Sequence, residues 1–275
     1  MHDDPVFERG LPRFTELLDR HGIRATFFVN ALDLKDPSKR SALARLAADG
    51  HEIANHGLDH AYLCGLPHAE KARHIAESSS LLEDFVGRPV RGFRAPGYSA
   101  DGDVLNLLEA RGYLYDSSAF PSSIGPLLRM SQWLRGGSRA VSYPSWQACF
   151  GSIRPYRPAR TSLYRRGEAG ILEVPVSVVP WLRLPLHFSY AAVLGGSYLD
   201  VGLRCALRAG SPVNFLFHLV DFADPLEGAL FRFVPGLKTP LAERLALADR
   251  AMSLLARQTQ PLPTATLCER LAVAP

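Results

Sequence analysis

The chain has 275 residues, and 47% of them are hydrophobic, so it is long enough to bury a large core as one α/β domain. We therefore expect a single domain that covers residues 1–275. The formal net charge of +4 arises from Lys and Arg residues that are interspersed with acids, and no run of five or six like charges occurs. This pattern predicts a solvated surface and no nucleic-acid partner.

The composition also argues against a membrane span. The most apolar stretch, Ile171 to Trp181, is shorter than the ~18 residues that a transmembrane helix requires, and it contains Glu173. The first residues, Met1 to Pro5, lack the basic and apolar regions of a secretory signal, so we expect a soluble cytoplasmic protein. The cysteines form no CxxC pair, which predicts buried free thiols at Cys64, Cys149, Cys205 and Cys268.

The first half of the chain alternates helical and extended patterns. Apolar residues recur at helical spacing from Leu11 to His21, and Gly22 follows where a helix C-cap would fall. The β-branched and aromatic residues of Ala25 to Val29 predict a buried strand. The alternation continues with a helix at Ser38–Ala48, a strand at His51–Asn55, a helix at His68–Val86, a strand at Val90–Arg94, a helix at Asp103–Ala110 and a strand at Tyr113–Tyr115.

An irregular segment, about residues 121–170, interrupts this rhythm with Gly, Ser, Pro, Arg and aperiodic aromatic residues. It is either an ordered loop that faces a sugar or a disordered one. The later elements are a strand at Leu172–Val176, a helix at Tyr198–Ala209, a strand at Val213–Phe217 and helices at Leu241–Arg257 and Leu267–Leu271. Strands separated by helices predict a parallel sheet or barrel, with chemistry at the carboxyl ends of the strands.

Two histidines directly follow one of these predicted strands. His56 and His60 are four residues apart, and a helical turn there would place both imidazoles on one face, where they can share a divalent ion. Two exposed histidines on a turn are the alternative interpretation.

An arginine and a third histidine also stand at strand ends. Arg94 precedes a Pro-Gly turn, where its guanidinium can hold a carboxylate through a bidentate fork, although an ordinary surface arginine fits the same pattern. His218 ends an apolar strand, with Asp221 nearby, and suits proton transfer at neutral pH. A hydrogen-bonded core histidine is the alternative for His218.

Taken together, these segments resemble the polysaccharide deacetylase family, the NodB-homology domain. Five segments match the family's motifs in the family's order, and they extend from Asp3 to Asp221. They are Asp3-Asp4, His56 with His60, Arg94 to Tyr98, Tyr115-Asp116-Ser117-Ser118, and Leu216-Phe217-His218.

The resemblance implies a distorted (β/α)7 barrel and a metal-dependent hydrolase. The enzyme would remove an N-acyl group, most simply N-acetyl, from an amino sugar in a polysaccharide or glycolipid. By the resemblance, Asp4, His56 and His60 would hold the divalent ion, for which Zn²⁺ is the first candidate. A carboxylate with two imidazoles leaves open positions on zinc for water and the substrate carbonyl oxygen.

The remaining roles also follow from the resemblance. Asp3 would act as the general base, and Arg94 would orient it. His218, as the cation, would protonate the departing amine, and Asp116 would tune His218.

The N-terminus departs from the family pattern. Relatives have an apolar strand before the acidic pair, whereas only Met1 and His2 precede it here. Either the barrel lacks its first strand and Asp3-Asp4 serve at the chain end, or the acidic pair lies upstream of Met1. Pro5 also stands where many relatives have glycine, and Ser118-Ala119-Phe120 lacks the tryptophan often found there.

These departures keep other functions open. A non-catalytic, carbohydrate-binding remnant of the same fold would retain the barrel without a working acidic motif. A deformylase of a lipid-linked amino sugar would use the same site, because a formamide needs the same chemistry.

Overall fold

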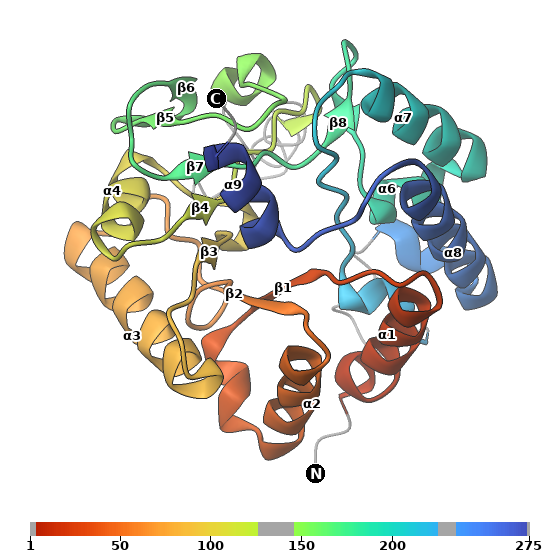
Figure 1. Cartoon of the computed structure of the whole chain (residues 1–275), viewed down its shortest axis with the longest axis horizontal. Coiled ribbons are helices and arrows are strands. Elements are labelled where there is room, and N and C mark those ends of the chain that lie inside the picture. The colour runs from red at the N-terminus through yellow and green to blue at the C-terminus, as the bar shows by residue number, and fades with distance from the viewer. Residues whose placement is uncertain (1–3, 126–145, 225–234, 274–275) are drawn as a thin grey trace, which may run out of the picture.

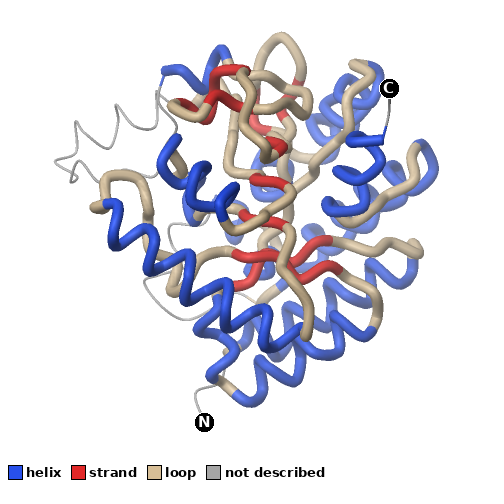
Figure 2. Tube along the Cα trace, turned by 60° about the vertical axis from the view of Figure 1, so that its left-hand side comes forward, coloured by secondary structure: helices blue, strands red, loops and turns tan. Residues whose placement is uncertain are grey.

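The computed structural model describes residues 4–125, 146–224 and 235–273. Helices surround a curved sheet of short parallel strands, as Figures 1 and 2 show. The strands follow the order β1-β2-β3-β4-β7. Their bounds are β1 Thr26–Val29, β2 Glu52–Asn55, β3 Gly92–Phe93, β4 Tyr115–Asp116 and β7 Leu172–Glu173. Because every neighbouring pair is parallel, the carboxyl ends of these strands meet at one edge.

Apart from α6, which the sequence patterns did not predict, the helices begin and end within a few residues of the predicted positions. The long ones are α1 Leu11–Arg20, α2 Pro37–Ala48, α3 His68–Val86, α4 Gly102–Ala110, α6 Phe188–Leu194, α7 Gly196–Arg208, α8 Leu241–Gln258 and α9 Thr264–Val273. The Asp36 carboxylate caps α2 by accepting from the backbone N–H groups of Ser38 and Lys39. Gly87 ends α3 at φ 70°, a conformation that favours glycine.

Short helical turns complete the description: η1 Val6–Gly10, η2 Ala31–Lys35, η3 Pro96–Tyr98, η4 Trp146–Phe150, η5 Leu219–Phe222 and η7 Pro235–Lys238. η1 runs directly into α1, so helical structure begins five residues before the predicted start. η5 follows the stretch that was expected to be the last strand. Both turns therefore lie at the carboxyl edge of the sheet.

The sheet continues past β7 as an irregular, curved ladder. The Val174 N–H donates to the Asp116 carbonyl, the Ser177 N–H donates to the Asn214 carbonyl, and the Phe188 N–H donates to the Leu216 carbonyl. Through these hydrogen bonds, the curved sheet continues from β4 to residues 213–217. The predicted distorted α/β barrel is confirmed.

Some predicted strands are wrong in length or position. The strand expected at Val90–Arg94 is reduced to Gly92–Phe93, and the one expected at Tyr113–Tyr115 lies at Tyr115–Asp116. Residues 213–217 are extended but form no regular strand, because their hydrogen bonds go to a loop on one side only. Sequence patterns mark apolar runs, whereas a regular strand also needs a neighbour in register.

Residues 121–125 and 146–170 of the irregular segment lie within the described part of the chain. They hold an antiparallel pair, β5 Pro158–Ala159 with β6 Ser162–Arg166, and are followed by a second pair, β8 Val178–Val179 with β9 Leu184–Pro185. The sequence patterns predicted neither pair, nor α6. The rest of the segment, residues 126–145, lies outside the described residues.

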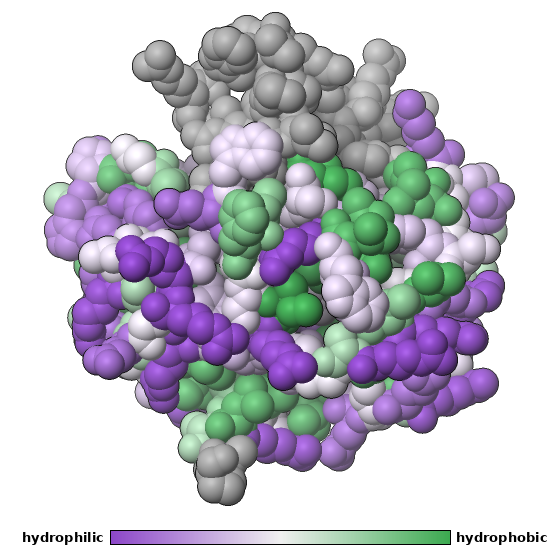
Figure 3. Space-filling model, turned by 90° about the horizontal axis from the view of Figure 1, so that it is seen from above, coloured by the Kyte–Doolittle hydropathy of each residue, from purple (hydrophilic) through white to green (hydrophobic). Residues whose placement is uncertain are grey.

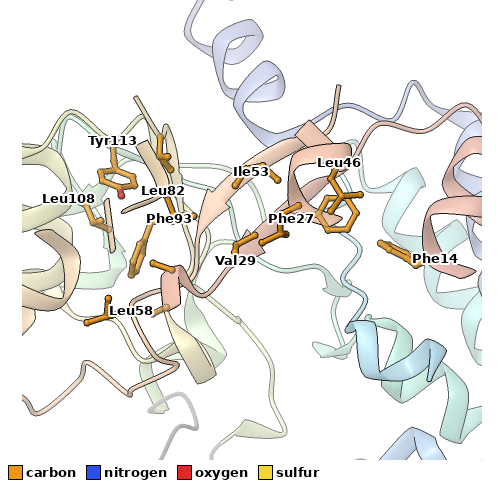
Figure 4. Packing of buried hydrophobic residues seen from close by; sticks show 14 of the residues in the cluster. Phe14, Phe27, Val29, Leu46, Ile53, Leu58, Leu82, Phe93, Leu108 and Tyr113 are labelled. Carbon is orange, nitrogen blue, oxygen red and sulfur yellow. The ribbon is translucent and has the colours of Figure 1, made fainter. Parts of the chain in front are cut away.

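The core fills the space between the sheet and the outer helices. The Phe14 ring of α1 lies 5.8 Å from the Phe27 ring of β1 and 4.7 Å from the Phe222 ring of η5, centroid to centroid. Figure 4 shows Phe14 and Phe27 together with Leu46 and Ile53 around β1 and β2. Burial of these side chains holds α1, β1 and η5 together.

The surface is mixed in character. Figure 3 shows hydrophilic residues on both flanks of a central region that contains hydrophobic ones. No helix in the described ranges has the length and apolar composition that a bilayer crossing demands. All four cysteines are free, and only Cys268 is buried; Cys64 is exposed, so the prediction of buried thiols holds for one of them in full.

Candidate functional site

A cavity of about 1210 Å³ opens among the carboxyl ends of the strands. Its lining includes four of the residues singled out from the sequence, His56, His60, Arg94 and His218. His56 and His60 follow β2, Arg94 follows β3, and His218 follows the extended residues 213–217, so the sheet's parallel order brings together residues from three positions far apart in the chain. The cavity is therefore the candidate site.

His56 stands at the end of β2 with its ring orientation fixed. Its Nδ1 lies 2.6 Å from the Arg94 carbonyl oxygen, which can only accept, so Nδ1 carries the proton and donates. The lone pair is then on Nε2, the arrangement that a metal-binding histidine uses. Burial lowers the pKa of His56 to about 3, which keeps the ring neutral at neutral pH.

His60 completes a pair with His56. Their ring centroids are 5.2 Å apart in an edge-to-face arrangement, and His60 adopts φ 64°, a left-handed conformation that is uncommon for a non-glycine residue. Burial also lowers the pKa of His60. Two neutral imidazoles at this separation have the chemistry of a divalent-ion site. Across the described residues, however, no group of three His, Cys, Asp or Glu side chains is arranged to hold an ion.

The third expected ligand, Asp4, is engaged elsewhere. One of its carboxylate oxygens accepts from the Val6 and Phe7 backbone N–H groups, and the other lies 2.8 Å from the Lys39 ammonium. The expectation that Asp4 joins His56 and His60 is therefore not met. The physical reason is that a carboxylate just before a helical turn is favoured by the unpaired N–H groups there. Asp3, the expected general base, lies outside the described residues.

Arg94 is buried beside the histidines, and its Nε and Nη2 groups donate to neutral partners. Its guanidinium donates to the Ser117 carbonyl at 2.9 Å, to the Ser117 hydroxyl at 2.7 Å and to the Asn214 side chain at 3.4 Å. It also lies 4.2 Å above the Phe28 ring. These contacts hold the positive charge of Arg94 at a fixed place in the cavity wall. They do so without the Asp3 carboxylate that Arg94 was expected to orient.

His218 is held by a small polar network. Its Nδ1 lies 3.1 Å from the Ser189 hydroxyl and 3.8 Å from the Asp221 carboxylate, and its backbone N–H donates to Asp221 at 3.0 Å. Asp221 is fully buried, whereas the His218 side chain is 49% exposed. The histidine is thus anchored at one end and open to the cavity at the other.

The acid next to His218 is therefore Asp221 and not Asp116, which corrects the expected partner. Asp221 was noted in the sequence only as a neighbour, and its three-residue spacing from His218 was the available signal. Ser189 was missed altogether, because it lies on the unpredicted α6.

Asp116 belongs to a different pair. It is fully buried, accepts from the Ser118 hydroxyl at 2.6 Å and is hydrogen-bonded to the buried Glu173 carboxyl group. Burial raises the pKa of both groups, and the neighbouring Asp116 raises that of Glu173 further. Two carboxyl groups in contact cannot both ionise, so this pair keeps one proton, on Glu173.

One further histidine was missed in the sequence. His187 precedes α6, and its ring lies 5.9 Å from the His218 ring and 4.7 Å from the Tyr190 ring. It is 6% exposed, and burial lowers its pKa to about 3. An isolated histidine in an irregular apolar stretch gives no periodic signal, which is why its position emerged only from the fold.

Sequence comparison agrees with the arrangement of the site. Residues 2–115 match the polysaccharide deacetylase family, a range that includes His56, His60 and Arg94. Over this range the chain is similar to the polysaccharide deacetylases. The match ends one residue before Asp116 and does not reach His218, so the second half of the site rests on the structure alone.

Two curated deacetylases are among the relatives. A peptidoglycan deacetylase-like protein of Gibberella zeae is 34% identical over 112 residues, which cover 40% of this chain and 32% of the relative. A chitooligosaccharide deacetylase of Sinorhizobium fredii is 29% identical over 153 residues, which cover 55% of this chain and 63% of the relative. The chain thus spans from about a third to somewhat under two thirds of these relatives' length.

Solved structures share the fold. A structure from Mycobacterium smegmatis that is assigned to the polysaccharide deacetylases superposes over 97% of this chain and 78% of its own, with a TM-score of 0.60 at 20% identity. The PuuE allantoinase superposes over 98% and 74%, with a TM-score of 0.61 at 16% identity. At such identities the likeness establishes the barrel only, since one fold serves several substrates.

Proposed function

We propose that this domain hydrolyses the N-acyl group, in the first place N-acetyl, of an amino sugar. The observation that carries the proposal is that His56, His60, Arg94 and His218 line one cavity at the carboxyl ends of the strands. Three imidazoles and a fixed cation in one cavity are suited to polarising an amide and moving a proton to its nitrogen. The activity of deacetylase relatives supports the same reaction class.

Each residue has a chemical task that its surroundings support. The Nε2 atoms of His56 and His60 are the donors that we assign to a divalent ion, with Zn²⁺ the first candidate, because both rings are neutral and one is oriented by the Arg94 carbonyl. A divalent ion bound there would polarise the acyl carbonyl and lower the pKa of a water molecule. Since no third protein ligand converges among the described residues, we assign none.

His218 supplies the proton for the departing amine. An amine is a poor leaving group unless it is protonated as the C–N bond breaks. Asp221 and Ser189 hold the His218 ring by its Nδ1 edge, which leaves the Nε2 edge for the substrate nitrogen. The Arg94 guanidinium adds a fixed positive charge to the cavity wall, where negative charge develops on the acyl oxygen during attack.

The structure also favours a second candidate function. His56 and His60 have no third metal ligand beside them among the described residues, and Asp4 is bound to Lys39. A domain with this defect would bind a glycan without turning it over. We keep carbohydrate binding without catalysis as the alternative, and deformylation of a lipid-linked amino sugar as a variant of the leading proposal.

Acetate release from N-acetylated chitooligosaccharides and peptidoglycan fragments, measured with added Zn²⁺, tests the proposal. We expect release by the parent protein and none by a variant with both His56→Ala and His60→Ala. His68→Ala is the matched control, because His68 lies on the exposed surface of α3 and pairs with Asp103. Glycan binding by the parent without release of acetate or formate would establish the non-catalytic alternative.

A further inference from the structure

The two side chains that support His218 stand on different segments of the chain. Asp221 belongs to η5, and Ser189 belongs to α6. The Ser189 hydroxyl lies 3.1 Å from the His218 Nδ1 and 3.1 Å from an Asp221 carboxylate oxygen. These hydrogen bonds form only while α6 and η5 keep their relative position, because a hydrogen bond is lost by about 3.5 Å. Whatever fixes α6 against η5 therefore also fixes the His218 ring.

Arg244 lies where these two segments meet. It stands in the first turn of α8, a helix that packs against both η5 and α6, and Figure 1 shows α6 and α8 side by side. The Arg244 side chain is fully buried, which is rare for an arginine. A buried guanidinium needs acceptors for its N–H groups. The acceptors that Arg244 uses show which parts of the chain it joins.

On one side, Arg244 binds the end of η5. Its Nη1 donates to the Asp221 carbonyl, and its Nη2 donates to the Ala223 carbonyl at 2.9 Å. The carbonyl groups at the end of a helical turn have no partner within that turn. The guanidinium therefore supplies donors that the end of η5 lacks, and it fixes the backbone of the residue whose carboxylate holds His218.

On the other side, Arg244 is joined to α6 through Thr239. The Arg244 Nε donates to the Thr239 carbonyl at 3.0 Å, and the Thr239 hydroxyl donates to the Ala192 carbonyl at 2.7 Å. Ala192 lies in the same short helix as Ser189. Arg244 thus connects the segment that carries Asp221 to the helix that carries Ser189.

The charge of Arg244 also acts on Asp221. Burial lowers the pKa of Arg244, and the charge of Asp221 is the largest effect in the opposite direction. An arginine nevertheless stays protonated in proteins. Because the Asp221 carboxylate is fully buried too, the attraction between the two charges offsets part of the cost of burying each of them.

The geometry of these contacts is specific to a guanidinium. Three N–H groups of one planar fork reach the carbonyl groups of Asp221, Ala223 and Thr239. A lysine ammonium carries its donors on a single atom and cannot reproduce such a fork. Filling of the core would need volume and no donors, so a methionine would replace Arg244 at small cost if packing were its task.

We propose that Arg244 is a positioning residue for His218. It holds η5 and α6 at the spacing at which Asp221 and Ser189 both support the His218 ring. The effect of Arg244 on turnover rests on the proposed deacetylase function, whereas its effect on the order of the His218 backbone does not.

The test compares Arg244→Met and Arg244→Lys with the parent protein. Arg250→Met is the matched control, because Arg250 lies on the exposed side of the same helix and pairs with Asp200. Amide hydrogen exchange is measured at His218, whose N–H donates to the Asp221 carboxylate. Exchange in the middle of α3 reports global opening, and acetate release gives kcat and KM.

We expect exchange at His218 to be at least ~10-fold faster in Arg244→Met, with exchange in α3 unchanged. The value of kcat should fall at least ~10-fold with KM within ~2-fold, because the proton donor is displaced and the substrate contacts are not. Arg244→Lys should lie between Arg244→Met and the parent in both measurements, since the ammonium keeps the charge and part of the hydrogen bonding. Arg250→Met should match the parent.

Equal exchange at His218 in the parent and in a folded Arg244→Met protein would overturn the proposal. Equal acceleration at His218 and in α3 would also overturn it, because Arg244 would then serve global stability alone. A parent protein that releases no acetate would remove the proposed function, and the exchange at His218 would still decide the role of Arg244.

A second pair of variants decides the matter if Arg244→Met does not fold. They are Arg244→Lys and Thr239→Val, the latter of which removes the hydrogen bond to the Ala192 carbonyl. Faster exchange at His218 than in α3 in both variants supports the proposal, and its absence in either one overturns it.

Discussion

The Nδ1 atom of His56 lies 2.6 Å from the backbone carbonyl oxygen of Arg94. This hydrogen bond links the loop after β2 to the residue that follows β3, orients the imidazole and leaves its Nε2 as the free nitrogen. The two residues are separate signals in the sequence, 38 residues apart. In the structure they act as one unit.

The first prediction concerns zinc affinity. We expect His56→Ala to weaken Zn²⁺ binding by at least ~100-fold, because residues that merely orient a metal ligand are already worth ~10–100-fold. The measurement is calorimetric titration of metal-free protein with Zn²⁺, with His68→Ala as the control. Equal affinity in His56→Ala and the parent would remove His56 from the site.

The second prediction concerns the support of His218. Asp221→Asn is expected to lower kcat ~10–100-fold with little change in KM, because Asp221 holds His218 in position through its backbone N–H and through the Ser189 hydroxyl. Loss of the ring in His218→Gln should cost more, ~10²–10⁴-fold. Steady-state kinetics of acetate release provides the measurement. Asp224→Asn, which alters a partly exposed partner of Arg13, should behave as the parent does.

The third prediction concerns acid stability. Burial lowers the pKa of His187 to about 3, below its unfolded value near 6.5. The unfolded chain therefore binds a proton first as the pH falls, so the stability that neutral His187 contributes is present above pH ~6.5 and is lost on acidification. Between pH 6.5 and 5.5 this loss is about 1 kcal/mol.

We expect His187→Gln to show a correspondingly shallower decline over that pH range in urea unfolding. His68→Gln is the control, because His68 is exposed, and it should retain the parent's slope. A His187→Gln profile parallel to that of the parent would show that His187 is protonated in the folded protein.

The fourth prediction concerns Glu173. Its pKa is raised well above 4.5 by burial and by Asp116, so the folded chain holds a proton that the unfolded chain releases. Stability from this group is therefore present below pH ~4.5 and is lost as the pH rises toward the folded pKa, by about 1.4 kcal/mol for each pH unit in that window.

Glu173→Gln is expected to flatten this decline, because the amide can still accept from the Ala119 N–H and can donate to Asp116 without ionising. Chemical unfolding from pH 4.5 to 8 measures the slope, and Glu77→Gln on the exposed surface of α3 serves as the control. An unchanged slope would place the proton of the pair on Asp116.

Local patterns in the sequence determine much of this protein. The helical periods place α1, α2 and α3 almost to the residue, since buried stripes and an end signal such as Gly22 are local properties of the chain. Strand ends followed by His56, Arg94 and His218 predict which side chains share the cavity, because carboxyl ends of parallel strands converge.

Only the tertiary structure decided what those side chains touch. Asp221 and Ser189 replace Asp116 beside His218, and Asp116 pairs with Glu173, because contacts between distant segments depend on how the barrel curves and not on spacing along the chain. Asp4 likewise met Lys39 in place of the histidines.

The backbone edges of the strands are the plainest case. The apolar residues of β1 and of 213–217 predicted extended segments. A strand inside a sheet also needs hydrogen-bond partners along both of its backbone edges. The sequence determined the local conformation and the chemistry of each strand end. The fold alone decided which edges were paired, because backbone hydrogen bonds between strands are made across space and leave no mark in the residues that make them.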